Sequence, residues 1–204
     1  MKKAFCVLLA AVLVFSFCSC GAKPEEVERK LYSEVAEGSF ADGRYYNEAF
    51  GIGFNPPEDW DFYGHKKMKD NLYGADIAFT PENPIFYDMM CVDSESGASI
   101  YIYYENMEET RGKILSEEEY ILEMAENMEK AYSAAEVKIL KNKIGSMKID
   151  GENLYCHEFN MEINGFNIPT ETLLRKTENY MAVMVLSYGF SPDKNEMVKG
   201  LFFE

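Results

Sequence analysis

The spacing of hydrophobic residues changes along the chain and divides it into a leader, a charged segment and a folded unit. Residues 4–17 are almost all apolar and carry no charge. Residues 21–42 are rich in charge, with apolar residues at every fourth position from Val27 to Val35, which indicates a short amphipathic helix or a solvated spacer. From Arg44 onward, short apolar runs separated by turn residues predict strands.

Two groups of strands are predicted in the first half of this unit. Segments 44–47 and 50–54 have the composition of strands, and two consecutive prolines end the second because proline cannot donate to a strand ladder. Segments 86–92 and 98–104 are joined by a short polar connection that suits a tight turn. The second pair therefore predicts an antiparallel hairpin.

The clearest helix is predicted from Ser116 to about Ala135. Ser116 with Glu119 three residues later has the spacing of a capping box, and an acidic first turn complements the positive end of the helix. Apolar residues at intervals of three and four predict one buried stripe. This stripe contains Ile121, Met124, Ala125, Met128, Ala131 and Tyr132.

Three turn signals, fourteen residues apart, predict a long β-meander in the second half of the chain. Dipeptides such as Asp-Gly and Asn-Gly fill tight hairpin turns because their residues accept positive φ. The strand between the first two signals alternates apolar and polar residues, and the nearly all-apolar segment 180–188 predicts a strand covered on both faces. The three signals are Asp150-Gly151, Asn164-Gly165 and Glu178-Asn179.

A helix is predicted at the end of the sequence. Ser191 suits its cap and Pro192 its first position, and one apolar stripe follows. Taken with the segments above, this predicts an α+β fold in which helices cover a mainly antiparallel sheet. The stripe contains Met197, Val198, Leu201 and Phe202.

Composition and charge narrow the classes of function. The 204 residues suit one domain of ordinary size with a tether. Thirty-five acidic residues against twenty basic ones give a net charge of −15, which argues against nucleic acid as a partner because neutralising phosphates needs a basic face. Two histidines supply few bases or metal ligands, which disfavours most hydrolases and zinc enzymes.

The leader resembles the signal peptide of a bacterial lipoprotein. Two lysines precede the apolar segment, which is too short to span a bilayer comfortably. The motif Phe17-Cys18-Ser19-Cys20-Gly21 that follows resembles a lipobox, and Cys20 is the predicted lipidation site because a small residue precedes it, whereas phenylalanine precedes Cys18. An ordinary secretory peptide cut near residue 22 and an uncleaved anchor are the alternatives.

Lipidation at Cys20 implies a lipid bilayer as a permanent partner through an N-terminal anchor, since each buried CH₂ contributes ~0.8 kcal/mol. The predicted organisation is a signal peptide at 1–19, an acidic tether, possibly part helical, at 20–43 and a domain at 44–204. The predicted location is extracytoplasmic, on the bacterial cell membrane. The negative charge of the domain favours a position away from an anionic leaflet.

The order of motifs in the domain resembles the PsbP-like family, which also includes the Mog proteins. The motif Tyr45-Tyr46-Asn47 is followed by Gly51-Ile52-Gly53-Phe54, by Pro57 and by Trp60, and then by a hairpin, a long helix, long meander strands and a terminal helix that ends in residues 197–203. The resemblance covers roughly residues 44–204. It implies a three-layer α/β/α sandwich that serves as a binding or assembly module, and it implies no catalytic residues.

The sequence contains no recognisable catalytic, metal-binding or cofactor-binding motif. His157 lies on the apolar face of its strand, which indicates a hydrogen-bonded core histidine. Residues 93–95 lack the spacing of a calcium loop and predict a plain turn. Cys91 and Cys156 are interpreted as two buried thiols, with a disulfide as the alternative that export would permit.

One basic cluster stands out in the acidic domain and is the candidate partner-binding patch. An exposed aromatic side chain beside local positive charge suits an anionic partner or a lipid headgroup. The alternative interpretation is a solvated turn with the tryptophan in the core. The patch consists of Trp60, His65, Lys66, Lys67 and Lys69.

The favoured hypothesis is a non-catalytic binding or scaffolding module of the bacterial cell envelope, whose partner is an envelope protein or a small ligand. Two alternatives remain open. One is a carboxylate-dependent envelope enzyme, because a pair of acids is enough for glycan chemistry. The other is a ligand- or ion-binding carrier, which would contain a deep apolar cavity lined by Tyr101, Tyr103 and Tyr104.

Overall fold

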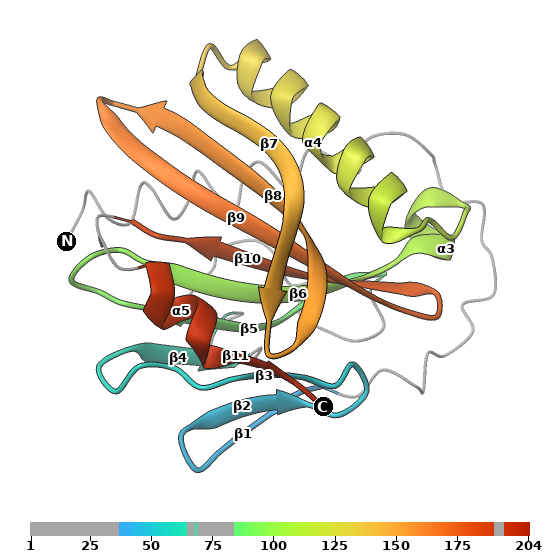
Figure 1. Cartoon of the computed structure of the whole chain (residues 1–204), viewed down its shortest axis with the longest axis vertical. Helices are drawn as coiled ribbons and strands as arrows, with labels where there is room; N and C mark the ends of the chain where they lie inside the picture. Colours follow the sequence, from blue (N-terminus) through green and yellow to red (C-terminus); the bar gives the residue numbers. More distant parts are fainter. Residues whose placement is uncertain (1–36, 65–67, 69–83, 190–193) are drawn as a thin grey trace.

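The computed structural model describes residues 37–64, 68, 84–189 and 194–204. Within these ranges the chain forms an α+β fold dominated by antiparallel sheets (Figure 1). In chain order the elements are β1 (Ser39–Ala41), β2 (Arg44–Asn47), β3 (Ile52–Phe54), β4 (Asp61–Gly64), β5 (Ile85–Val92), β6 (Ser99–Asn106), α3 (Met107–Arg111), α4 (Glu117–Ala134), β7 (Lys138–Ile149), β8 (Glu152–Ile163), β9 (Phe166–Thr177), β10 (Tyr180–Ser187), α5 (Lys194–Gly200) and β11 (Leu201–Phe203).

A seven-stranded sheet forms the centre of the molecule, in the order β4-β5-β6-β10-β9-β8-β7, with each neighbouring pair antiparallel. The predicted meander is confirmed, and its last strand pairs with β6 of the predicted hairpin. Both central residues of two hairpin turns have the positive φ angles that tight turns need. These angles are 49° and 88° in Asp150-Gly151 and 53° and 80° in Asn164-Gly165. Six of the eight residues of β10 are buried, which confirms that this strand is covered on both faces.

Helices α4 and α3 cover one face of the large sheet. The predicted capping box is present: the Ser116 hydroxyl accepts a hydrogen bond from the Glu119 N–H at 3.2 Å, and the Glu119 carboxylate accepts one from the Ser116 N–H at 2.8 Å. No helix in the described ranges has both the length and the apolar character to cross a membrane. The buried side of α4 adds Tyr120 to the predicted stripe and leaves Ala131 half-buried; it contains Tyr120, Ile121, Met124, Ala125, Met128 and Tyr132.

The opposite face is covered by a smaller sheet, in the order β1-β2-β3-β11, together with α5 (Figure 1). Ile52 and Phe54 of the small sheet and Met197 of α5 share a buried cluster with side chains of β5, β6 and β10. The fold therefore has three layers around a mainly antiparallel sheet, as expected, and strands supply much of one outer layer. The cap predicted at residues 191–192 lies outside the described residues.

Both ends of the small sheet differ from the sequence prediction. Leu201–Phe203 form β11, antiparallel to β3, so the prediction of a helix through Phe202 is wrong. The free edge of β3 offers backbone groups that these residues satisfy. Ser39–Ala41 form β1, which joins β2 through the Asp42-Gly43 turn (φ 53° and 76°). The small sheet thus includes residues that the sequence assigned to the tether.

The glycines of the Gly51-Ile52-Gly53-Phe54 motif allow β11 to approach β3. A Cβ atom on Gly53 would lie 1.8 Å from the Phe202 ring. Gly51 has a φ of +56°, and a Cβ atom there would lie 2.1 Å from the backbone oxygen of Glu204. Close approach of two backbones is a common reason for glycine within a strand.

Candidate functional site

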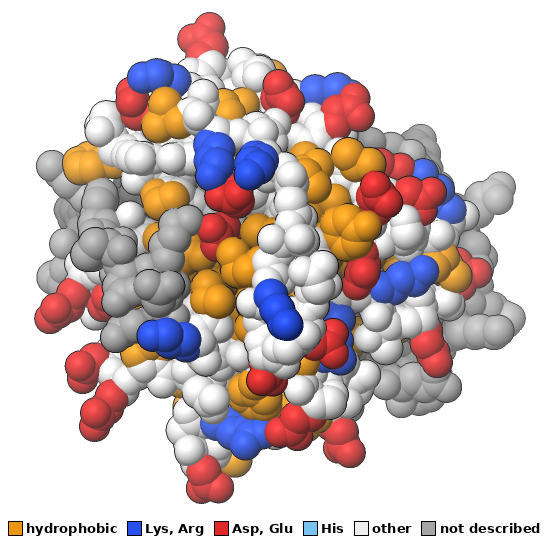
Figure 2. All heavy atoms as spheres, in the orientation of Figure 1, with side chains coloured by type: hydrophobic (Ala, Val, Ile, Leu, Met, Phe, Trp, Pro, Cys, Tyr) orange, Lys and Arg blue, Asp and Glu red, His pale blue; other side chains and the backbone are white. Residues whose placement is uncertain are grey.

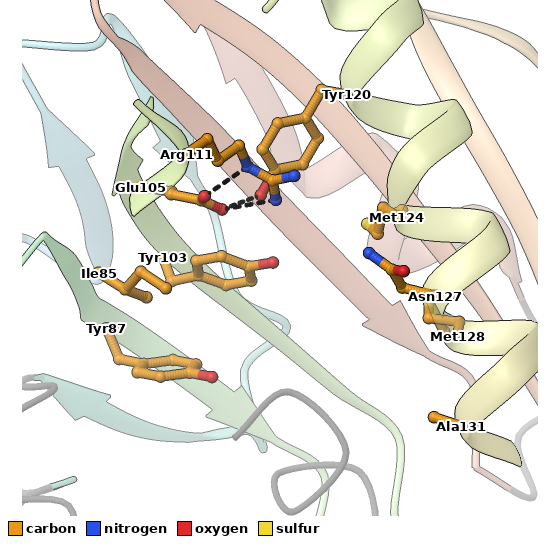
Figure 3. Close-up of a pocket in the computed structure, with 10 residues that line it drawn as sticks. All are labelled: Ile85, Tyr87, Tyr103, Glu105, Arg111, Tyr120, Met124, Asn127, Met128 and Ala131. Atoms are coloured by element: carbon orange, nitrogen blue, oxygen red, sulfur yellow. Dashed lines mark hydrogen bonds and ion pairs between the residues drawn. The ribbon is translucent and has the colours of Figure 1, made fainter. Parts of the chain in front are cut away.

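A groove of about 50 Å³ lies between α4 and strands β5 and β6. Figure 3 shows its two walls, one on the strands and one on the helix, with a polar group of residues at one end. Because the walls are mainly apolar and aromatic, the groove suits an apolar group, and its charged contacts are confined to that end. The lining residues are Ile85, Tyr87 and Tyr103 on the strands, Met124, Asn127, Met128 and Ala131 on α4, and Glu105, Arg111 and Tyr120 at the polar end.

Glu105, at the end of β6, is the centre of the polar end and is 4% exposed. Its Oε1 accepts hydrogen bonds from Arg111 Nε at 2.6 Å and from the Thr110 hydroxyl at 2.6 Å. Its Oε2 accepts from Arg111 Nη2 at 3.2 Å and from the Tyr120 hydroxyl. A two-pronged arginine contact and two hydroxyl donors together stabilise this buried carboxylate.

Arg111 connects the α3 turn to α4. Its Nη1 donates to Glu123 at 3.1 Å, and its guanidinium lies 4.3 Å from the centre of the Tyr120 ring. Burial works against the charge of Arg111, but the hydrogen bonds and charges of Glu105 and Tyr120 together outweigh it and raise the pKa of the guanidinium. Burial and the Glu105 charge also raise the pKa of Tyr120 well above its usual value. These two groups therefore keep their protons near neutral pH, which suits binding rather than proton transfer.

The groove is much smaller than the pockets of 300–1,000 Å³ that hold whole small molecules. It suits one side chain or a group of similar size. Of the three tyrosines that the carrier hypothesis places around a deep cavity, Tyr103 lines the groove. Tyr104 faces the other side of the sheet, where its hydroxyl lies 3.0 Å from that of Tyr45. The described cavity does not support a carrier.

A buried carboxylate, Asp88, joins the small sheet to the large one. It occupies a bulge of β5, where the pairing register shifts between the residues on either side. It accepts hydrogen bonds from the Gly38 N–H at 2.9 and 3.1 Å, from the Tyr45 hydroxyl at 2.5 Å and from Asn47 Nδ2 at 2.8 Å. Tyr45 and Asn47 are alternate residues of β2 and share a face. The Tyr-x-Asn motif therefore serves the docking of the two sheets.

Two acids face each other on neighbouring strands: Glu158 of β8 is directly opposite Glu171 of β9. Glu158 accepts a hydrogen bond from Lys141, and Glu171, 4% exposed, accepts one from the Tyr188 hydroxyl. Burial and this hydrogen bond raise the pKa of Tyr188, so the phenol remains a donor. Each acid is thus engaged by a donor of its own.

His157 is fully buried on the helix-covered face of β8. Its Nε2 lies 2.7 Å from Asn142 Oδ1, and Asn142 Nδ2 donates to Glu129 of α4 at 2.9 Å. Because the amide uses its N–H toward Glu129, its oxygen accepts from His157, which fixes the proton on Nε2. The interpretation of a hydrogen-bonded core histidine is confirmed.

The structure places one member of the predicted patch. Trp60, which follows a turn closed by a hydrogen bond from its N–H to Pro57, is half-buried and packs against the core cluster beneath the small sheet. The other members lie outside the described residues, as does the predicted lipidation site. They are His65, Lys66, Lys67, Lys69 and Cys20.

The two cysteines and the acidic turn considered in the sequence have structural roles. Cys91 and Cys156 are free and buried. They lie on β5 and β8, four strands apart, so about 19 Å separates them and a disulfide is excluded. Asp93 accepts from the backbone of Glu95 and Ser96, which confirms a plain turn. Within the described ranges, no group of three or more His, Cys, Asp or Glu residues is placed to hold a metal ion.

Sequence reasoning missed Glu105 and Arg111. Glu105 lies near the end of a mainly apolar strand. A charged residue next to a buried apolar run is a signal, because a buried charge needs an oppositely charged or hydrogen-bonding partner. Arg111 reaches it because it ends the five-residue α3. The N-cap of this helix is Asn106, whose side chain accepts a hydrogen bond from the Glu109 N–H at 3.3 Å. So short a helix has no periodicity from which to predict it.

No protein-family model matches the chain, and no curated protein matches its sequence. Among solved structures, the chain is similar to the cyanobacterial PsbP (CyanoP) of Synechocystis sp. PCC 6803, with a TM-score of 0.47 and 11% identity, covering 91% of this chain and 99% of that one. It is also similar to a protein of Bacteroides thetaiotaomicron VPI-5482, with a TM-score of 0.43 and 10% identity, covering 79% of this chain and 48% of that one. A PsbP is thus among the solved structures that this chain resembles, and its own strand order and helices establish the α+β fold.

Proposed function

We propose that this protein is an extracytoplasmic lipoprotein, anchored to the bacterial cell membrane through Cys20, that acts as a non-catalytic binding or scaffolding module of the envelope. The observation that carries the proposal is the leader. A pair of lysines, an apolar segment at 4–17 and the Cys20-Gly21 pair follow one another in the order of a lipoprotein signal.

The chemistry of the described domain supports binding without catalysis. His157 and the two thiols are buried in the core, and the Asp88 carboxylate is used to join the sheets. The groove beside α4 presents an apolar surface whose ionic groups, Glu105 and Arg111, already satisfy each other. Such a surface gains binding free energy from apolar burial, at about 25 cal/mol per Å².

The charge of the mature protein supports a position away from the bilayer. Cleavage before Cys20 removes two lysines and no acids, so 18 basic residues face 35 acidic ones and the net charge becomes −17. An acidic domain on a lipid anchor is repelled by an anionic leaflet. The groove of a domain held in this way is open to proteins or ligands of the envelope.

A second candidate function has one observation in its favour. Glu158 and Glu171 face each other across two strands, and paired acids are the minimum for glycoside hydrolysis. Release of reducing sugar from cell-wall glycan by the wild type, and its loss in Glu171→Gln, would replace the binding proposal with the carboxylate enzyme. We expect both the wild type and Glu171→Gln to release reducing sugar only at the background rate.

Lipidation tests the location. Cells fed an alkyne-labelled fatty acid should label the wild type and the Cys18→Ser variant, but not Cys20→Ser. The Cys20→Ser protein should also leave the membrane fraction. Label that persists in Cys20→Ser, or a wild-type protein recovered from the cytosol with its leader intact, would overturn the location.

Affinity capture tests the binding function. The intact lipoprotein is used to recover partners from detergent-solubilised envelopes, beside Ala131→Trp, which fills the groove, and Ala134→Trp, which adds the same bulk at an exposed position of α4. We expect Ala131→Trp to lose a partner that Ala134→Trp retains. Trp60→Ala and neutralisation of the three lysines test the patch in the same assay. Equal recovery by every variant contradicts both surfaces.

A further inference from the structure

The outer edge of β7 is a long open strand edge. β7 is the last strand of the large sheet, and among the described strands β8 is its neighbour on one side and none lies on the other. Eight of its twelve residues are exposed and one is buried. Such an edge presents a row of backbone N–H and C=O groups that can pair with another strand.

The charge of β7 is opposite to that of the protein. The strand contains four lysines and no acid, in a chain whose net charge is −15. Lys138 is paired with Glu162 at 3.0 Å and Lys141 with Glu158, whereas no described ion pair involves Lys143 or Lys148. In Figure 2 basic side chains follow the course that β7 takes in Figure 1.

The geometry of β7 allows strand addition over most of its length. The pairing with β8 shifts between Ile139 and Lys141, which marks a bulge at Leu140, and is regular from Lys141 to Ile149. Nine regular residues span about 30 Å. Lys143 and Lys148 are separated by an odd number of positions, so they lie on opposite faces of the sheet. Positive charge is therefore available on both faces of this edge.

Charge then selects among possible partners. A second copy of the protein that added through its own β7 would bring the four lysines of each strand to one interface, and this like-charge repulsion disfavours it. An extended segment with acids on both faces would instead gain backbone hydrogen bonds and neutralise the unpaired lysines.

We propose that β7 is the docking edge for an extended acidic segment of a partner protein, which adds to the large sheet as an eighth strand. The inference rests on the binding function proposed above and adds to it a further surface with the chemistry of its partner. It places this surface at the opposite edge of the large sheet from β4.

The experiment measures the binding of three fluorescent ten-residue peptides to the full-length lipoprotein in neutral detergent. One peptide has glutamates on both faces of a valine- and threonine-rich strand, the second has lysines at the same positions, and the third has the composition of the first with two central prolines. We expect the acidic peptide to bind and the other two not to bind. Hydrogen exchange should show new protection at amides of β7.

Two pairs of charge reversals test the lysines. K143E/K148E should weaken binding of the acidic peptide about ten-fold. K113E/K130E makes the same change of net charge on and beside α4, where both lysines are exposed, and should leave binding within about two-fold. Both variants alter exposed side chains, and matching melting temperatures confirm that each is folded.

Several results would overturn the inference. Equal binding of the proline peptide, or binding without protection of β7, would mean charge attraction without strand addition. Binding to anionic phosphatidylglycerol vesicles that K143E/K148E abolishes, with no affinity for the acidic peptide, would assign the lysines to a membrane surface. If K143E/K148E recovers the same envelope partners as the wild type, the inference about β7 is overturned and the proposed binding function stands. The binding function itself fails if the wild type recovers no partner.

Discussion

His157 makes the stability of this protein depend on pH between about 7 and 5, above the range in which most carboxyl groups titrate. The imidazole is fully buried, and its Nε2 donates to Asn142, which in turn donates to Glu129. Its Nδ1 has no hydrogen-bond partner among the described residues. A second proton would therefore place a charge in the core without a partner, and burial lowers the pKa of His157 from 6.5 to about 4.

The size and the sign of the effect follow from this shift. Between pH 6.5 and pH 4 the unfolded chain binds a proton at this residue that the folded protein refuses, so the free energy of unfolding falls as the pH falls. The complete shift is worth about 3 kcal/mol, and the part between pH 7.5 and pH 5 is worth about 2 kcal/mol. Above pH 7 the contribution is constant.

Urea unfolding followed by circular dichroism at pH 7.5, 6.5, 5.5 and 5.0 measures this dependence. We expect the wild type to lose about 2 kcal/mol across the series, and His157→Gln, whose amide can still donate to Asn142, to lose far less. His65→Gln removes the other histidine and should keep the wild-type slope. A slope that survives in His157→Gln, or that disappears in His65→Gln, would refute the assignment.

Three further changes test the packing. Gly53→Ala places a methyl group 1.8 Å from the Phe202 ring and should lower the melting temperature by several degrees. Gly145→Ala, whose added methyl group would meet no atom within 4 Å, should leave the melting temperature nearly unchanged. A similar loss in both variants would contradict the packing argument. Asp88→Ala leaves two buried donors, on Tyr45 and Asn47, and the half-buried Gly38 N–H without their acceptor. It should cost roughly 3 kcal/mol or more in urea unfolding, with Asp88→Asn costing less. Ser116→Ala removes a helix cap and should cost about 1 kcal/mol, and no loss would mean that the capping box adds nothing to the stability of α4.

The parts of the fold that the sequence predicts well depend on neighbours along the chain. The capping box of α4 and the turns at Asp150-Gly151 and Asn164-Gly165 are written in two to four consecutive residues, because φ preferences and local hydrogen bonds act at that range. The buried strand β10 is visible in composition alone, since a strand covered on both faces has no polar side to show.

Long-range contacts decide the parts that the sequence does not predict. Leu201–Phe203 continue an apolar stripe of helical spacing, yet they form a strand because β3 offers unpaired backbone at that place. The partnership of Glu105 with Arg111 depends on the turn of α3, and the meeting of Tyr45 and Asn47 at Asp88 depends on a bulge in a strand about forty residues away.

The sequence by itself therefore determined the long helix, the central hairpin and the meander strands, the excess of acid and the order of motifs in the leader. The tertiary structure decided which polar groups are buried together, that Cys91 and Cys156 are too far apart to bond, and that the lysines of β7 lie on an open edge. The physical reason is that backbone preferences act between neighbours in the chain, whereas the pairing of charges, donors and strand edges is set by distances that exist only after the layers have packed.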